Sequence, residues 1–195
     1  MKKKQLLIFI VSLLFIAPLS AQNHEVRASA GFITTSDFGD FFSDLIVEAI
    51  TIGSYSTDNV SNSSAIGFEY WHSQGKVIKL GGLFSYQSIN KDVSSLGEKM
   101  GNIKNRYFTI MPEISFEYVT AEWVQIYSGL GAGITILNQD FDSSQTDVAS
   151  STESEAMFNF HVNAIGMRVG KAFGGSAELG VGAKGILNLG LSYRF

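Results

Sequence analysis

Charged residues recur on the polar face of several stretches that alternate apolar and polar side chains. The eight charged residues assigned to this face are Arg27, Glu69, Lys79, Glu113, Glu117, Arg168, Glu178 and Arg194. If these faces meet in one interior, four acids and four bases must pair there or stay hydrated, because burial of an unpaired charge is costly. The pattern therefore predicts a closed ionic core, with a set of charges lining a narrow aqueous path as the alternative.

Three histidines, His24, His72 and His161, are the other side chains suited to acid–base chemistry. His161 shares a polar face with Asn163, and Ser115 is a candidate neighbour. A single histidine in such a setting is more often a hydrogen-bonded interior residue than a general base. The sequence lacks the G-x-S-x-G, H-E-x-x-H and phosphate-loop patterns. We therefore expect no catalytic site.

Acidic residues without any basic neighbour gather in the segment 139–155. They are Asp140, Asp142, Asp147, Glu153 and Glu155. A divalent cation or a basic partner could bind there, but the spacing fits no EF-hand. The segment is more typical of a solvated loop, and we expect no metal and no cofactor.

Eight stretches carry the alternation that positions these residues. Successive side chains of a strand point to opposite faces, so the pattern predicts strands with one apolar and one polar face. The expected strands cover residues 24–34, 63–72, 76–87, 105–119, 123–138, 156–170, 176–183 and 185–195. The phase of the sixth stretch switches near Ala164, which predicts a β-bulge there.

The connections between these stretches alternate in length. Segments 73–75, 120–122 and 170–174 are short, whereas 35–62, 88–104 and 139–155 are long and 182–185 is a tight exception. Short turns at one end and long loops at the other are typical of transmembrane β-barrels, in which backbone groups facing lipid must pair within a closed sheet. We therefore predict an all-β, eight-stranded, antiparallel up-and-down transmembrane β-barrel.

Residues 38–52, within the first long connection, have apolar residues at helical spacing. They predict a short helix in the first extracellular loop, with Asp37 as an acidic neighbour of its N-terminus. The helix either lies on the membrane rim or packs its apolar face over the barrel opening.

Aromatic residues concentrate at the ends of the expected strands, as they do at membrane interfaces. One group is Tyr70, Trp71, Tyr118, Trp123, Tyr193 and Phe195, and the other is Phe32, Tyr86, Phe108, Phe158 and Phe160. Two aromatic girdles are therefore expected.

Residues 1–21 have the pattern of a cleaved signal peptide, with three lysines, an apolar run from Leu6 to Phe15 broken only by Ser12, and small residues before Gln22. An uncleaved anchor is the alternative, but the run is shorter than the ~20 residues of a spanning helix. The barrel domain is then 22–195. The formal charge of −4, or about −7 without the leader lysines, argues against nucleic acid as a partner.

The final segment, Leu189-Gly190-Leu191-Ser192-Tyr193-Arg194-Phe195, resembles the closing strand of Gram-negative outer-membrane barrels, which ends on an aromatic residue. The resemblance implies that Tyr193 and Phe195 form the signal read by the barrel-insertion machinery. In its overall pattern the chain resembles the small, porin-like barrels of the OmpX, OmpW and OmpA type. That resemblance implies an outer-membrane location, in contact with outer-membrane lipid and lipopolysaccharide.

Two functions remain open at this point. One is a structural or interaction role, in which a barrel with a closed polar interior presents extracellular loops to an unknown partner. The other is a narrow, porin-like conduit for small solutes or hydrophobic ligands. A lipid-modifying barrel enzyme is a distant third possibility because it would depend on His161.

Overall fold

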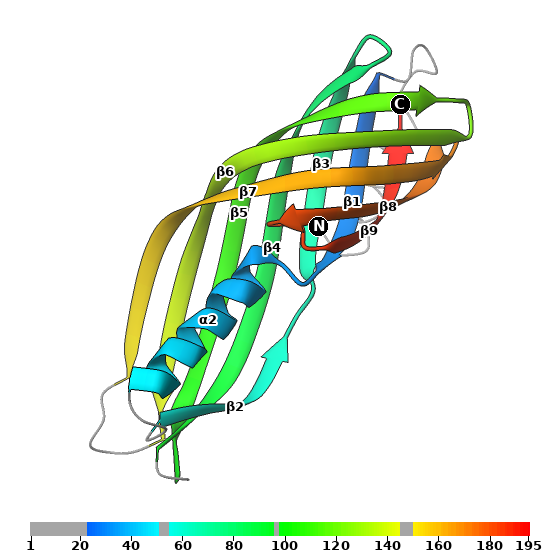
Figure 1. The fold of residues 1–195 in the computed structure, drawn as a ribbon. Coiled ribbons are helices and arrows are strands. Elements are labelled where there is room, and N and C mark those ends of the chain that lie inside the picture. Colours follow the sequence, from blue (N-terminus) through cyan, green and yellow to red (C-terminus); the bar gives the residue numbers. More distant parts are fainter. Residues whose placement is uncertain (1–22, 51–54, 96–97, 145–149) are drawn as a thin grey trace, which may run out of the picture.

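Eight antiparallel strands close into a ring in the computed structural model of this chain, which describes residues 23–50, 55–95, 98–144 and 150–195 (Figure 1). Each strand of the ring pairs with its neighbour along the chain, and β1 pairs with β9 to close it. The ring strands are β1 (His24–Phe32), β3 (Ala65–Gln74), β4 (Ile78–Ser95), β5 (Glu98–Thr120), β6 (Val124–Ser143), β7 (Ser151–Gly170), β8 (Phe173–Gly182) and β9 (Leu187–Arg194). The predicted eight-stranded up-and-down barrel is confirmed. The expected signal peptide, 1–21, lies outside the described residues.

Strand β5 illustrates how the alternating sequence pattern forms an inner and an outer face of the barrel. Tyr107, Met111 and Glu113 are buried in the interior, whereas Ile110, on the opposite face, is 57% exposed. A period of two puts every second side chain inside. Because the ring closes, no sheet edge is left unpaired within it.

The ring strands fall into two length classes. Strands β4 to β7 have 18 to 23 residues, whereas β1, β3, β8 and β9 have 8 to 10. The four long strands continue past the ring as two hairpins, β4–β5 and β6–β7 (Figure 1). We call this side the long-hairpin end, and the opposite side, with the turns 75–77, 121–123 and 171–172, the short-turn end.

The long hairpins correct two sequence predictions. Segments 88–104 and 139–155 were expected as loops, but most of their described residues continue the paired strands. Beyond the apolar zone both faces of a strand are polar, so the alternation that identifies a half-buried strand disappears there. The predicted bulge is confirmed, because the β7–β8 register shifts between Asn163 and Ile165.

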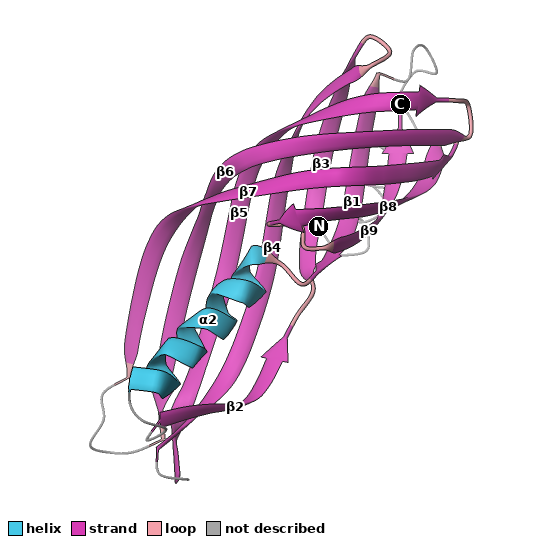
Figure 2. Cartoon of the chain, viewed as in Figure 1, coloured by secondary structure: helices cyan, strands magenta, loops and turns pink. Residues whose placement is uncertain are grey.

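The first long connection contains two elements, α2 (Thr35–Ile50) and β2 (Tyr55–Asn62). The predicted helix is confirmed, although it begins earlier than residue 38 (Figure 2). Thr34 and Asp37 explain the early start because they form a reciprocal cap: Asp37 N donates to Thr34 Oγ1, and Thr34 N donates to Asp37 Oδ2 at 2.6 Å.

Strand β2 was not predicted; it pairs with the distal part of β4 outside the ring. Among the described residues, no helix is long and apolar enough to cross a membrane.

Candidate functional site

The barrel interior holds a dense group of paired charges. In the part of the ring nearest the short-turn end, ten charged side chains of the described residues are 8% exposed or less. The members of this ionic cluster are Glu25, Glu69, Glu113, Glu117 and Glu178 with Arg27, Lys79, Arg168, Lys184 and Arg194. Equal numbers of acids and bases leave the cluster without net formal charge, which limits the electrostatic cost of burying it.

Glu25 is the centre of the cluster at the short-turn end. Its carboxylate lies 3.0 Å from Arg194 Nε, 3.2 Å from Lys79 Nζ and 3.1 Å from Arg27 Nη2, and Arg168 Nε is 3.5 Å away. Among the described residues, no second carboxylate pairs with Arg168 or Arg194. One carboxylate therefore compensates two arginines that would otherwise be buried without a counter-ion.

Arg27 occupies the middle of the cluster. It pairs with Glu178 and lies 3.4 Å from Glu69 Oε2. Tyr127 donates its hydroxyl to Glu178 at 2.8 Å, and the Arg27 guanidinium lies 5.4 Å from the centre of the Tyr127 ring. Trp71 donates Nε1 to Glu69 at 2.8 Å. Aromatic donors thus satisfy carboxylate lone pairs that the cations leave free.

Lys184 enters the cluster from the β8–β9 turn rather than from a strand. Its ammonium lies 2.9 Å from Glu178, 3.3 Å from Glu113 and 3.5 Å from Glu69. The turn is held tightly over the barrel, since Gly185 adopts a φ of 86°, which favours glycine, and Gly185 N donates to Gly182 O. The β8–β9 turn therefore supplies a lysine whose side chain points into the barrel interior.

All eight charged residues singled out from the sequence lie in this cluster, and the structure adds Glu25 and Lys184 to them. Glu25 could have been found, because it lies two residues before Arg27 and therefore on the same face of β1. Lys184 gave no such signal, because it lies in a turn, where a lysine is ordinarily solvent-exposed.

Above the cluster, the interior changes to a small apolar layer and then to polar contacts with α2. Leu83, Met111 and Ala183 form the buried apolar layer. Beyond it, Asp40 of α2 accepts hydrogen bonds from Asn105 at 2.7 Å and from Tyr107 at 2.8 Å, both on the inner face of β5. The helix therefore begins near the rim of the ring and runs along the inner face of the extended strands (Figure 1).

Lys91 fastens the helix from the other side. Its ammonium lies 2.9 Å from Asp40 and 2.7 Å from Asp44, and its side chain is only 4% exposed. Between the helix and β5 to β7 there remains a cavity of about 610 Å³, whose lining includes Thr35, Met157 and Asn159.

His161 is buried next to the ionic cluster, at 1% exposure. Neither ring nitrogen has a hydrogen-bond partner among the described residues. A general base needs a hydroxyl or water within hydrogen-bond reach and usually a third group to orient it. The described structure shows no such arrangement at His161.

Of the acidic segment 139–155, residues 145–149, and with them Asp147, lie outside the described residues. Asp140 pairs with Arg106 and accepts a hydrogen bond from Thr152 at 3.1 Å. In the described part of the chain, no three His, Cys, Asp or Glu residues gather in a geometry that could hold a metal ion.

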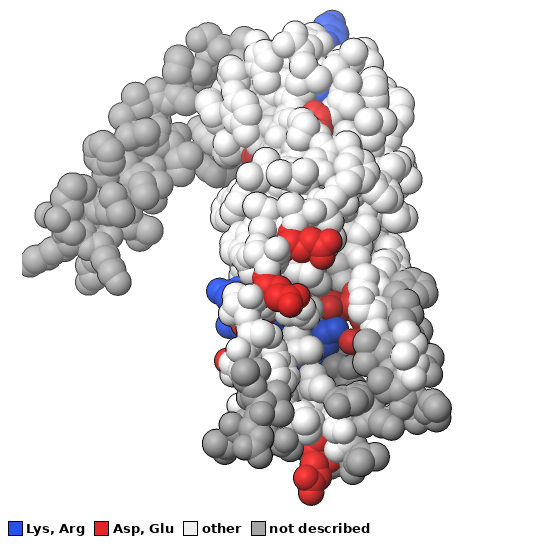
Figure 3. Space-filling model, turned by 90° about the vertical axis from the view of Figure 1, so that its left-hand side faces the viewer, with Lys and Arg blue, Asp and Glu red and all other residues white. Residues whose placement is uncertain are grey.

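The outer wall of the ring is apolar. The exposed large apolar side chains on it include Phe68, Phe84, Ile110, Leu130, Ile134, Phe160, Val162, Leu179, Val181, Leu189 and Leu191. In the half of the wall toward the short-turn end few charged side chains are visible, whereas charged side chains gather in the half toward the long hairpins (Figure 3). A continuous apolar belt of this kind is unfavourable in water.

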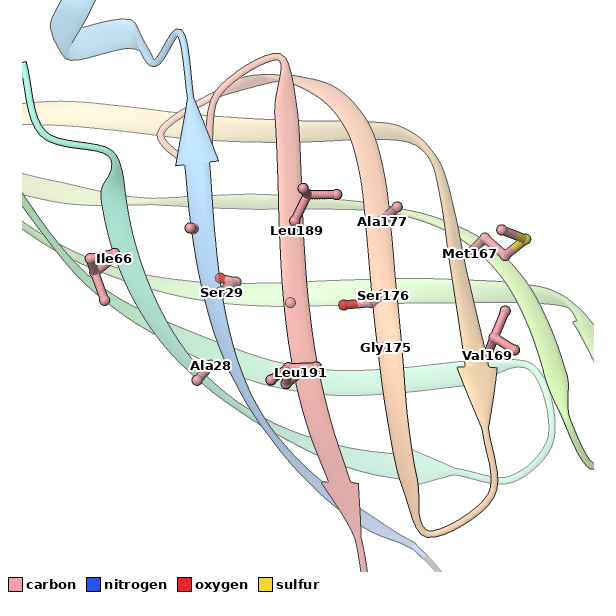
Figure 4. Close-up of a pocket in the computed structure, with 12 residues that line it drawn as sticks. Ala28, Ser29, Ile66, Met167, Val169, Gly175, Ser176, Ala177, Leu189 and Leu191 are labelled. Atoms are coloured by element: carbon pink, nitrogen blue, oxygen red, sulfur yellow. The ribbon is translucent and has the colours of Figure 1, made fainter.

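The apolar outer wall has a shallow groove where several of its side chains are small. Ala28 on β1, Ala177 on β8 and Leu189 on β9 border a shallow groove of about 670 Å³ (Figure 4). Its surface is almost entirely apolar, so hydrocarbon chains fit it better than water does.

All but one of the aromatic residues assigned to the two girdles are exposed or half-buried, as side chains on the outer wall are. Tyr70, Tyr118 and Trp123 are exposed near the short-turn end. Trp71 was expected beside them on the outside, but it is 5% exposed and points inward. It follows the period of two from Glu69, whereas its aromatic character alone suggested the girdle.

A closed ring with an apolar outer wall and a charged, paired inner wall is a transmembrane β-barrel, and this chain belongs to that structural class. No protein-family model and no curated protein matches the chain. Among solved structures it is similar to Ail, the attachment invasion locus protein of Yersinia pestis, with 15% identity and a TM-score of 0.46 over 90% of this chain and 100% of that chain. A structure of Ail in complex with the heparin analogue sucrose octasulfate matches with 17% identity and a TM-score of 0.45, over 89% of this chain and 99% of that chain.

Proposed function

We propose that this chain is an outer-membrane protein whose sealed barrel anchors the two long hairpins outside the cell as an interaction surface. The observation that carries the proposal is the ionic cluster, in which buried cations and carboxylates pair across the lumen. An interior of eight strands is just wide enough to be filled by side chains. The paired side chains therefore leave no water-filled path.

The orientation follows from the connections. Barrels of this class have short periplasmic turns and longer extracellular loops. The short-turn end then faces the periplasm, and β2, α2 and the distal parts of β4 to β7 face outward. Crossing the hydrocarbon takes about 9–11 residues of a strand, so each long strand has residues to spare for the outside.

Bilayer conductance tests the sealed interior. Purified protein inserted into planar bilayers is expected to give no sustained unitary currents, while a large porin in the same bilayers gives them. Steady currents from this protein would contradict the proposal and favour the narrow conduit. If such currents pass through this barrel, their ion selectivity is expected to change in Glu113→Gln, because that carboxylate lies in the lumen. Currents whose selectivity is the same in Glu113→Gln and in wild type would come from a contaminant.

The second part of the proposal is that Tyr193 and Phe195 form the signal read by the barrel-insertion machinery. The two rings stack with centres 5.9 Å apart on the outer wall, and Phe173 packs against Tyr193 at 4.6 Å. An aromatic surface exposed on the closing strand is available to another protein before β9 pairs with β1. Phe195→Ser is expected to slow insertion in cells while leaving refolding in detergent unchanged; equal losses in both would contradict an insertion signal.

A further inference from the structure

Two histidines lie side by side on the outer wall at the short-turn end. His24 begins β1 and His72 lies near the end of β3, and the two are direct partners in the strand register. Their neighbours Glu25 and Trp71 point inward, so both imidazoles point outward. The ring centres are 4.7 Å apart, and both side chains are half-buried.

The distance between their nitrogens fits a shared metal ion. His24 Nδ1 and His72 Nδ1 are 3.4 Å apart. Two imidazole nitrogens bound at about 2.0–2.1 Å to one tetrahedral Zn²⁺ are separated by about 3.3–3.4 Å. The hydroxyl oxygen of Tyr70 lies 2.7 Å from His24 Nδ1, which is a hydrogen-bond distance. A shift of about 0.6 Å away from that nitrogen would bring the oxygen to the separation of two ligands on one tetrahedral ion.

His24 Nδ1 has two polar neighbours, Tyr70 and His72. A neutral imidazole Nδ1 carries either one proton or one lone pair. His24 Nδ1 faces both Tyr70 and His72, so it can fully serve only one of the two. A cation that accepts the lone pairs of both histidines would satisfy both nitrogens at once.

The aromatic surroundings hold this arrangement in place. The His24 ring stacks on Phe195 at 5.8 Å and on Tyr70 at 5.9 Å. Restricted rings lose less conformational freedom when they bind a ligand. The position at the end of the strands, beside the 75–77 turn, gives access to water for the remaining coordination positions.

We propose that His24, His72 and Tyr70 form a binding site for a divalent transition-metal ion, with water completing the coordination. Nitrogen donors favour ions such as Zn²⁺ and Cu²⁺, whereas Mg²⁺ and Ca²⁺ prefer oxygen ligands. Because the ion would join β1 to β3, it would also tie together two neighbouring strands of the ring.

Copper binding tests the site directly. The full mature chain, prepared without a polyhistidine tag and folded in detergent micelles, is titrated with Cu²⁺ and with Zn²⁺. Electron paramagnetic resonance of the copper form is expected to show one equivalent bound with hyperfine coupling to two imidazole nitrogens. His24→Gln and His72→Gln are each expected to weaken binding at least about tenfold and to leave a single coupled nitrogen.

Two further variants separate this site from adventitious binding. Tyr70→Phe is expected to weaken binding while keeping both nitrogens, and His161→Gln, which alters the histidine inside the barrel, is expected to leave binding unchanged. Gel electrophoresis of heated and unheated samples verifies that each variant is folded, because the mobility of a folded barrel changes when heating unfolds it. Wild-type protein that binds no stoichiometric metal, or folded His24→Gln that binds as tightly as wild type, would overturn the proposal.

Thermal stability gives an independent measurement. An ion that binds only the folded ring stabilises it by mass action. Zn²⁺ is therefore expected to raise the temperature at which the gel mobility of wild-type protein changes, and not that of His24→Gln. An equal rise in both proteins would contradict a site at this histidine pair.

Discussion

The two ends of this molecule use the same strands in different solvents. On β7, Phe158, Phe160 and Val162 project from the outer wall, whereas the same strand begins with the polar exposed residues 151–155. Strand pairing between β6 and β7 continues through both parts. The ladder of backbone hydrogen bonds is therefore common to both parts of the strand. Only the side chains change, from apolar in the ring to polar in the long hairpin.

Ion pairs differ between the two ends in the same way. In the ionic cluster the charged groups are almost fully buried, whereas the Arg106–Asp140 pair on the long hairpins has side chains 37% and 23% exposed. Water and salt screen the exposed pair, whereas a sealed interior, as proposed above, would offer no solvent to replace a lost partner. The comparison predicts large effects of substitution in the ring and small effects on the hairpins.

The largest effect is expected for Glu25→Gln. The change keeps the size of the side chain but leaves Arg168 and Arg194 without a carboxylate. Breaking buried pairs of this kind costs about 3–5 kcal/mol, and we expect a loss of that size in the free energy of unfolding. Denaturant unfolding in micelles measures it; a loss as small as that of a surface pair would show that the interior is hydrated.

Lys184→Met is expected to rank next, at about 3 kcal/mol, because it leaves Glu69, Glu113 and Glu178 with less compensation. Glu113→Gln in the same chain removes one excess negative charge and should recover part of the loss. Additive losses in the double variant would mean that the two side chains do not interact.

The third prediction is for Thr34→Ala, which removes the capping side chain of α2 at the boundary between the two ends. Loss of the helix cap is expected to cost about 1 kcal/mol, which corresponds to amide exchange in α2 that is about fivefold faster. Amide exchange followed by mass spectrometry measures this, with the β1–β3 amides as the internal reference. Unchanged exchange in α2 would show that its barrel contacts, rather than its cap, hold the first turn.

Arg106→Ala is expected to have the smallest effect, below about 1 kcal/mol, since its partner Asp140 is partly hydrated and also bonds Thr152. The same denaturant titration measures the loss. A loss comparable to that of Glu25→Gln would remove the distinction between the two ends.

The sequence predicts the part of the fold that lies in hydrocarbon and much less of the part beyond it. The alternation of 107–117 places every inward residue of that part of β5 correctly, and the phase switch near Ala164 locates the bulge. Lipid on one side and packed side chains on the other impose that period on the sequence. Strand β2 and the distal hairpins have water on both sides, so no period distinguishes them from loops.

The interior site was predicted to a similar extent. Period-two reasoning found eight of the nine strand residues of the ionic cluster, and it reaches the ninth, Glu25, and also Trp71 when it is applied to every position regardless of residue type. Lys184 was beyond it, because its place in the cluster depends on how the 182–185 turn folds over the ring. Contacts made by a turn depend on tertiary structure that no local pattern encodes.

The central claim is that the apolar wall of the ring crosses a membrane while the long hairpins do not, and one strand is enough to test it. The chain has no cysteine, so Val162→Cys and Ser154→Cys each give a single labelling site on β7. Spin labels at these sites, in protein reconstituted into bilayers, report their surroundings through collisions with oxygen, which enters lipid, and with a water-soluble nickel chelate. We predict that the label at residue 162 collides mainly with oxygen and the label at residue 154 mainly with the chelate; equal exposure of both sites to the chelate would contradict the account.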